Sequence, residues 1–201
     1  MVQRIKNVSD IRWSDTQLAL KEKDLILLNK FPFKLPKLFI DLLKISDGGD
    51  IDYDFDYYDH YFHKKLEGFI SQIYGMCTEE SKMLNRHYDP ESLYDKDFIS
   101  YNNIIDNYNH PAEFFPKNLV AFGRNGGGDL ICFDYRVNPT SDNPPVVYWI
   151  FGRNEGEDIS FLANNFEEFL RILKEPEDDD EFGKALKDDP DLLEKVIREL
   201  K

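Results

Sequence analysis

Aspartates that alternate with apolar residues are the side chains of this sequence best suited to chemistry. Within residues 50–57 every second position is an acid, namely Asp50, Asp52, Asp54 and Asp56, and the positions between them are Ile, Tyr or Phe. Side chains of a β-strand alternate between its faces, so this period of two predicts one acidic and one apolar face. Four like charges on one strand face repel one another, and we therefore expect them to lie in water or opposite cations.

Calcium binding is one alternative for alternating acids, and the spacing argues against it. Phe55 stands where a calcium-binding loop needs glycine, and Tyr61 stands where the loop needs a bidentate glutamate. His60 and His63 follow closely, but a lone His-x-x-His lacks the further ligands of a metal centre. We therefore predict no metal and no cofactor.

Two similar turns carry the candidate anion ligands. Residues 122–129 (FGRNGGGD) are echoed by residues 151–158 (FGRNEGED), so Arg124 and Arg153 could meet on one anion. The alternative is two surface turns whose arginines pair with nearby acids. The glycines do not form a phosphate-binding loop, because no Gly-Lys-Ser/Thr follows them and the next segment has the pattern of a strand.

A search for nucleophiles finds no catalytic centre. The sequence has no Gly-x-Ser-x-Gly elbow. Cys77 and Cys132 lie in apolar, strand-like segments, carry no signature of activation and predict no disulfide framework. We therefore predict that the protein is not an enzyme. The N-terminus has no apolar signal segment and no run is long enough to span a membrane, which predicts a cytoplasmic protein.

The net charge of −14 is concentrated in two segments. Residues 46–60 hold six aspartates and no Lys or Arg, and residues 175–201 hold eleven acids against five bases. This field argues against nucleic acid as a partner, because phosphates need cations. It favours a basic protein partner, although the same charge would also serve solubility alone.

The elements that position these side chains begin with a hairpin. Apolar runs at residues 119–122 and 130–133 flank the glycine-rich turn and predict two strands buried on both faces. Ser14 and Gln17 have the spacing of a capping box, which predicts a helix over residues 14–29. The remaining pattern predicts strands at 50–57, 66–76 and 146–151 and helices at 36–47, 98–108, 158–175 and 190–200.

Several short motifs, in order, are similar to those of one known family. They are Leu35-Pro36 before a helix, Ser46-Asp47-Gly48-Gly49, Ile73-Tyr74-Gly75 at a strand end, residues 119–129, and Asn165-Phe166-Glu167-Glu168-Phe169-Leu170. Over residues 13–174 the chain resembles the SUKH superfamily, which includes bacterial immunity proteins and a fungal cell-wall assembly regulator. The resemblance implies an α+β fold, with one mainly antiparallel β-sheet and helices packed around it. It also implies a non-enzymatic role in binding and neutralising a cognate toxin, often a nuclease.

The resemblance and the composition divide the chain in two. We expect a SUKH-like domain over residues 1–175, followed by an acidic linker and an amphipathic helix over residues 176–201 as a C-terminal helical extension. The leading hypothesis is an immunity protein whose four aspartates meet a basic, nuclease-type toxin. The alternative is an intracellular scaffold or regulatory module, whose last helix docks on a partner or on a second copy of the chain.

Overall fold

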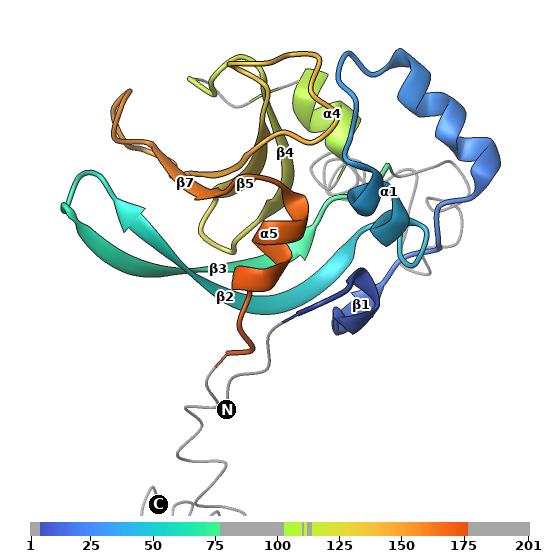
Figure 1. Cartoon of the computed structure of the whole chain (residues 1–201), viewed down its shortest axis with the longest axis horizontal. Coiled ribbons are helices and arrows are strands. Elements are labelled where there is room, and N and C mark those ends of the chain that lie inside the picture. The colour runs from blue at the N-terminus through green and yellow to red at the C-terminus, as the bar shows by residue number, and fades with distance from the viewer. Residues whose placement is uncertain (1–4, 77–102, 110, 112–113, 177–201) are drawn as a thin grey trace, which may run out of the picture.

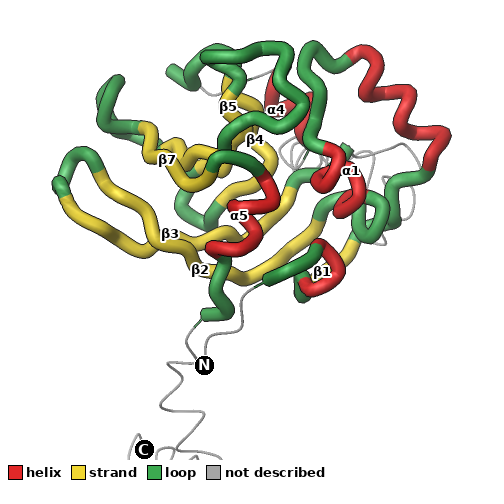
Figure 2. Tube along the Cα trace, viewed as in Figure 1, coloured by secondary structure: helices red, strands yellow, loops and turns green. Residues whose placement is uncertain are grey.

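An antiparallel sheet of seven strands forms the frame of the computed structural model (Figure 1). These strands belong to the residues that the structure describes, which are 5–76, 103–109, 111 and 114–176. Neighbours in the sheet are also neighbours in the chain, so the strands form a meander, against which helices pack (Figure 2). The predicted α+β fold with one mainly antiparallel sheet is confirmed.

The strands β2 and β3 are long, with 11 and 10 residues, and the other strands and the α-helices are short. The strands are β1 (Trp13–Thr16), β2 (Gly49–Asp59), β3 (Lys64–Ile73), β4 (Leu119–Arg124), β5 (Leu130–Asp134), β6 (Val146–Trp149) and β7 (Ile159–Ala163). The α-helices are α1 (Lys37–Leu43), α4 (Ile104–Asn109) and α5 (Phe166–Ile172). The 3₁₀ helices are η1 (Val8–Asp10) and η2 (Glu22–Lys30).

The predicted central hairpin is present as β4 and β5, which pair along their length. Phe122 and Phe133 stack across it with their ring centroids 4.2 Å apart. The Asn125 side chain organises the turn, since its Oδ1 accepts hydrogen bonds from the amides of Gly127 (2.8 Å) and Asp129 (3.0 Å). An asparagine that binds its own turn is a recurrent way to reverse the chain, so the glycines here are architectural.

Five phenylalanine rings form the centre of the core. Phe39 of α1 and Phe166 and Phe169 of α5 pack on Phe122 with ring centroids 5.5–5.6 Å apart. Together with Phe133, each of these residues is at most 1% exposed. Edge-to-face rings of this kind stabilise a core beyond the area that they bury, and they fix both helices against the middle of the sheet.

The sheet divides between β3 and β4. β3 pairs with β2 over its whole length but with β4 only at Gln72 and Ile73. The hairpin of β2 and β3 therefore passes on one side of α5 and the strands β4–β7 pass on the other (Figure 1). At its far end the hairpin returns to β7, where the Ser160 hydroxyl donates to the Tyr58 carbonyl oxygen at 2.6 Å.

The helix predicted over residues 14–29 is wrong at its start. Residues 13–16 are β1, in which Trp13 pairs with Ile51 and Thr16 with Gly49. The Gln17 amide donates to the Ser46 hydroxyl at 2.9 Å instead of closing a capping box with Ser14. The edge of β2 offers hydrogen bonds to these residues, and this tertiary pairing outweighs the local capping pattern. Helical structure appears later, in η2.

The helix predicted over residues 158–175 is also wrong at its start. Residues 159–163 are β7, which pairs with the edge of β6. The helix α5 begins after Asn165, whose side chain caps it by accepting a hydrogen bond of 2.9 Å from the backbone amide of Glu168. Apolar residues in this stretch fit both a strand and a helix, and the open edge of β6 decides between them.

Other predictions are confirmed in part or lie outside the described residues. The strands predicted at 50–57, 66–76 and 146–151 correspond to β2, β3 and β6, and the helix at 36–47 corresponds to α1. α4 covers the end of the helix predicted at 98–108. Cys77, the first part of that helix and the extension after residue 176 lie outside the described residues. Of the described helices, none is long and apolar enough to cross a membrane.

The contact between Gly75 and Asp47 yields the first prediction. A Cβ at Gly75 would overlap the backbone carbonyl of Asp47, whereas a Cβ at Gly126 would meet nothing within 4 Å. Overpacking against backbone has no flexible side chain to relieve it, so Gly75→Ala should lower the free energy of unfolding by at least ~2 kcal/mol. Gly126→Ala should change it by no more than about 0.5 kcal/mol. Urea denaturation of both variants tests this, and equal stabilities would contradict the packing described here.

Candidate functional site

The candidate site is a row of carboxylates along β2. Ile51, Tyr53 and Phe55 point into the core and are at most 2% exposed, as the alternation predicted. The intervening aspartates lie on the opposite, solvent-facing side, and Glu67 of β3 lies directly opposite Asp56. We call this set the acidic face, and it consists of Asp50, Asp52, Asp54, Asp56 and Glu67.

One lysine compensates part of this charge. The backbone of Lys174, just after α5, exchanges two hydrogen bonds of 2.9 Å with that of Asp54. Its ammonium group lies 2.5 Å from Asp56 and 3.5 Å from Glu67. The hydrogen bond to Asp56 raises the pKa of Lys174. Lys174 therefore neutralises part of the charge at the Asp56 and Glu67 end of the acidic face.

The acidic face differs in how firmly its members are held. The carboxylate of Asp50 accepts a hydrogen bond of 3.0 Å from the side-chain Nε2 of Gln72, and Asp52 is exposed to solvent. Because the other side of β2 is fixed in the core, the carboxylates keep their spacing without rearrangement. Among the described residues no group of three or more His, Cys, Asp or Glu side chains could hold a metal ion. The face can act by attracting and ordering cationic groups of another molecule.

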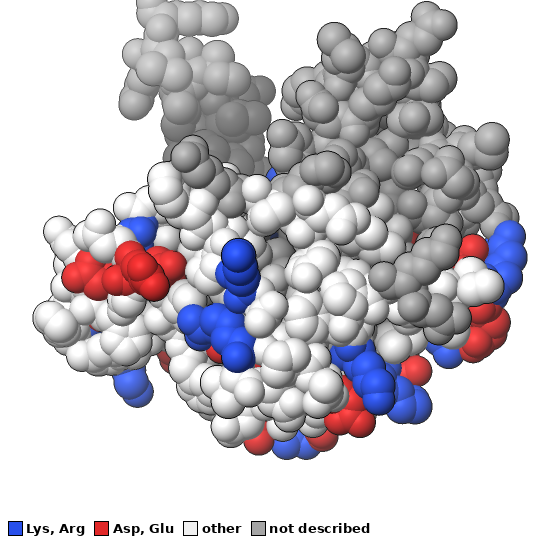
Figure 3. All heavy atoms as spheres, turned by 90° about the horizontal axis from the view of Figure 1, so that it is seen from above, with Lys and Arg blue, Asp and Glu red and all other residues white. Residues whose placement is uncertain are grey.

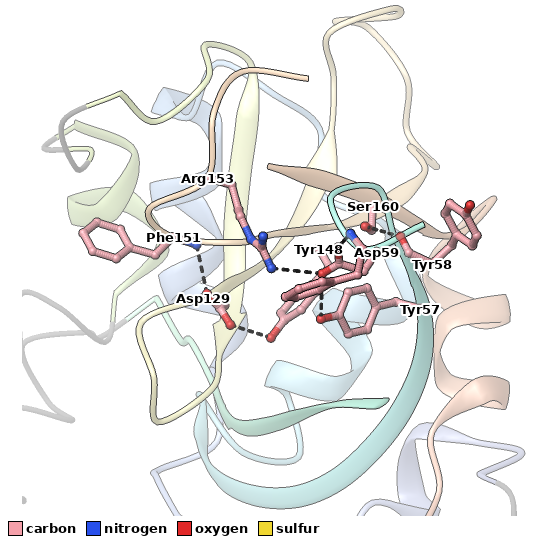
Figure 4. A network of polar contacts seen from close by, with 9 residues as sticks. Tyr57, Tyr58, Asp59, Asp129, Tyr148, Phe151, Arg153 and Ser160 are labelled. Atoms are coloured by element: carbon pink, nitrogen blue, oxygen red, sulfur yellow. Dashed lines mark hydrogen bonds and ion pairs between the residues drawn. The ribbon is translucent and has the colours of Figure 1, made fainter. Parts of the chain in front are cut away.

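A buried ion pair fixes the end of β2 beyond the acidic face (Figure 4). The Asp59 carboxylate has no exposed surface and lies 3.2 Å from the Arg153 guanidinium. The Asp59 carboxylate also accepts a hydrogen bond of 2.8 Å from the backbone amide of Phe62. Arg153 in turn lies over the rings of Tyr61 and Phe62, with its guanidinium carbon 4.4 and 5.0 Å from their centroids. The β2–β3 turn is therefore held to the β6–β7 loop.

A second carboxylate connects the two similar turns found in the sequence. Asp129 accepts a hydrogen bond of 2.7 Å from the Tyr148 hydroxyl and one of 2.9 Å from the Phe151 amide (Figure 4). The Tyr148 oxygen accepts a hydrogen bond from the Asn125 side chain at 2.9 Å. Burial and then the hydrogen bond to Asp129 raise the pKa of Tyr148, so the hydroxyl stays protonated. These hydrogen bonds tie the two turns to each other.

Arg124 and Arg153 have different partners in the structure. Arg153 forms an ion pair with the buried Asp59. Arg124 lines an open pocket with Asp50, Gln72 and the glycine-rich turn. The residues that contact Arg153 do not line this pocket, so the described contacts do not bring both arginines to one anion.

Sequence reasoning missed Asp59 and Lys174. A signal for Asp59 exists, because it falls in the apolar phase of the alternation, at an even spacing from Ile51, Tyr53 and Phe55. An acid in that phase must be buried and needs a cation. No comparable signal marks Lys174, which reaches the acidic face only because α5 ends beside β2.

Charge on a different face of the molecule is less ordered. Figure 3, seen from above relative to Figure 1, shows one group of acidic side chains at the left, Lys and Arg near the middle, and acids mixed with Lys and Arg at the lower right and right. Most of the described surface in that view carries neither charge. Among the described residues visible in this view, the charges form mixed groups and not a row of one sign like that along β2.

Comparisons with known proteins agree with the fold. The model of the SMI1 / KNR4 family (SUKH-1) matches residues 25–172. A similar curated protein is the SPbeta prophage-derived uncharacterized protein YokK of Bacillus subtilis (strain 168), 31% identical over 82 residues. That alignment covers 40% of this chain and 38% of YokK, so the chain spans less than half of that relative's length. No solved structure gives a significant match.

The ion pair at the end of β2 yields the second prediction. Arg153→Ala would leave the buried Asp59 carboxylate without its cation, so the free energy of unfolding should fall by about 3 kcal/mol. The matched control is Arg171→Ala, which removes an exposed helix ion pair with Glu167 and should cost no more than ~0.5 kcal/mol. Thermal and urea unfolding measure both effects. Equal losses in the two variants would contradict a structural role for the Asp59–Arg153 pair.

Proposed function

Because the chain belongs to the SMI1 / KNR4 family (SUKH-1), we propose that it is an immunity protein that binds and neutralises a cognate toxin. Proteins of this family are generally non-catalytic immunity or regulatory proteins, which supports a possible immunity role and a protein partner for this chain. The proposal goes further by naming the contact surface, which is the acidic face, and the kind of toxin, which is a basic, nuclease-type domain.

The observation that carries this proposal is the row of carboxylates along β2. These acids project from a strand whose other side is fixed in the core, so binding would not have to order them. A nuclease binds a polyanion and therefore presents a positive surface around its substrate site. A row of carboxylates at strand spacing would face that positive surface and exclude the nucleic-acid substrate from it. Its charge would also speed the association of the two proteins.

We propose that residues 1–175 carry this function. The family match ends at residue 172 and the last buried residue of the described core is Leu173. The segment 176–201 would then be an acidic linker and a helix separate from the toxin-binding domain.

We further propose that the protein acts in the bacterial cytoplasm, where a nuclease-type toxin has its substrate. The buried free thiol of Cys132 is compatible with a reducing compartment.

Co-expression with a toxin domain encoded beside the gene tests the proposal. Wild-type protein should restore growth and co-purify with the toxin. Replacing all four aspartates of β2 by asparagine should raise the dissociation constant about 100-fold at low salt, since four exposed ion pairs of about 0.7 kcal/mol each amount to two powers of ten.

A matched control removes the same number of acids from elsewhere on the surface. It combines Glu22→Gln, Asp41→Asn, Asp142→Asn and Glu167→Gln. This variant should bind and protect like the wild type. An unchanged affinity in the β2 variant, or an equal loss in both variants, would contradict the acidic face as the toxin-binding surface.

A further inference from the structure

The strand β3 has an open edge beside the acidic face. On one side it pairs with β2 from Lys64 to Ile73. On the other side it meets β4 only at Gln72 and Ile73, because the sheet divides there. Among the residues that the structure describes, none bonds the backbone of β3 along that side between Lys64 and Phe69.

The hydrogen bonds of β2 show which groups of β3 face the open side. The amide and carbonyl of Asp54 bond to Lys174, and the carbonyl of Tyr58 accepts the Ser160 hydroxyl, so both residues turn their backbone away from β3. Their partners across the ladder are Phe69 and Lys65. In an antiparallel pair, residues that do not bond each other direct their amides and carbonyls outward. The backbone groups of Lys65, Glu67 and Phe69 therefore point to the open side, where no described residue bonds to them.

The side chains at these positions lie on the same solvent-facing side as the acidic face. Phe69 is 40% exposed, and Lys65 and Glu67 are exposed. Charged side chains on an edge strand discourage unspecific pairing with other sheets. They also define which strand fits, namely one with an acid opposite Lys65, a base opposite Glu67 and an apolar residue opposite Phe69.

We propose that an extended segment of the toxin adds to the sheet as a strand at this open edge, bonding to the backbone of Lys65, Glu67 and Phe69. The inference rests on the proposed function and adds a second contact to it. Strand addition supplies affinity through main-chain hydrogen bonds and specificity through alternate side chains. Since neighbouring strands lie about 4.8 Å apart, the added strand would run about 10 Å from β2 and bring the body of the toxin over the acidic face.

Charge favours the toxin over a second copy of this chain as the occupant. Pairing of two β3 edges would place a second acidic face beside the first, in a molecule whose net charge is −14. Like charges at that distance oppose association. A basic toxin instead gains attraction from the acidic face while its segment pairs with β3.

Proline and alanine at the same position separate backbone from side-chain contributions. Phe69→Pro removes an amide that faces the open edge and takes no part in the pairing with β2, and Phe69→Ala removes only the ring. Lys65→Pro and Lys65→Ala form a second pair. The probe is the toxin domain encoded beside the gene. Each proline variant should bind it at least ~10-fold more weakly than its alanine counterpart, because proline removes about one main-chain hydrogen bond to the added strand.

A second measurement does not depend on the stability of the variants. Hydrogen exchange of the wild-type amides at Lys65, Glu67 and Phe69 should slow when the toxin binds. Equal affinities of proline and alanine variants, together with unchanged exchange at these amides, would overturn strand addition and leave the acidic face intact.

Two other outcomes distinguish the proposals. A wild-type protein that does not bind the toxin would overturn the proposed function and this inference together. Sedimentation velocity of the protein alone tests whether a second copy of this chain occupies the β3 edge. A dimer that the proline variants abolish and the alanine variants retain would overturn the toxin as the occupant of the edge.

Discussion

The strict alternation along β2 is the constraint on which the rest of the structure depends. Its apolar side joins the aromatic core through Phe55, whose ring packs on Tyr148 and Phe169. Its polar side carries four carboxylates at strand spacing. A one-residue slip of this strand would place the carboxylates in the core, so burial of one face fixes the register of the other.

Both ends of β2 are fixed by polar contacts that differ in kind. At the start of β2, Gly49 and Ile51 pair with residues of β1. At the end, the buried Asp59 meets Arg153 from the β6–β7 loop. Burial of a carboxylate is costly unless it is paired, so Asp59 depends on Arg153, and the pair fixes the position of the β2–β3 turn. The acidic face thus lies on a strand held at both ends, next to an open edge of β3.

The sequence alone predicted the features that depend on local pattern. The alternation at residues 50–57 and the apolar runs around the glycine-rich turn specify their own periods, and both appear as strands. The order of short motifs also identified the family, which the match over residues 25–172 confirms. The acidic face as a partner-binding surface stays a prediction.

Features that depend on distant pairing escaped prediction. Trp13–Thr16 and Ile159–Ala163 are strands because β2 and β6 offer them edges, and their own residues fit a helix equally well. The position of Lys174 depends on where α5 ends in space. The division between β3 and β4, which leaves the edge of β3 open, likewise depends on pairing between residues about fifty positions apart.

The most direct test of the central claim is the ionic-strength dependence of toxin association, measured by stopped flow. If the acidic face steers a basic partner, the association rate constant should fall at least ~10-fold between about 20 mM and about 500 mM salt, because screening shortens the reach of the charges. The dissociation rate constant should change far less. An association rate constant that stays level across this range would contradict an electrostatic role for the carboxylates of β2.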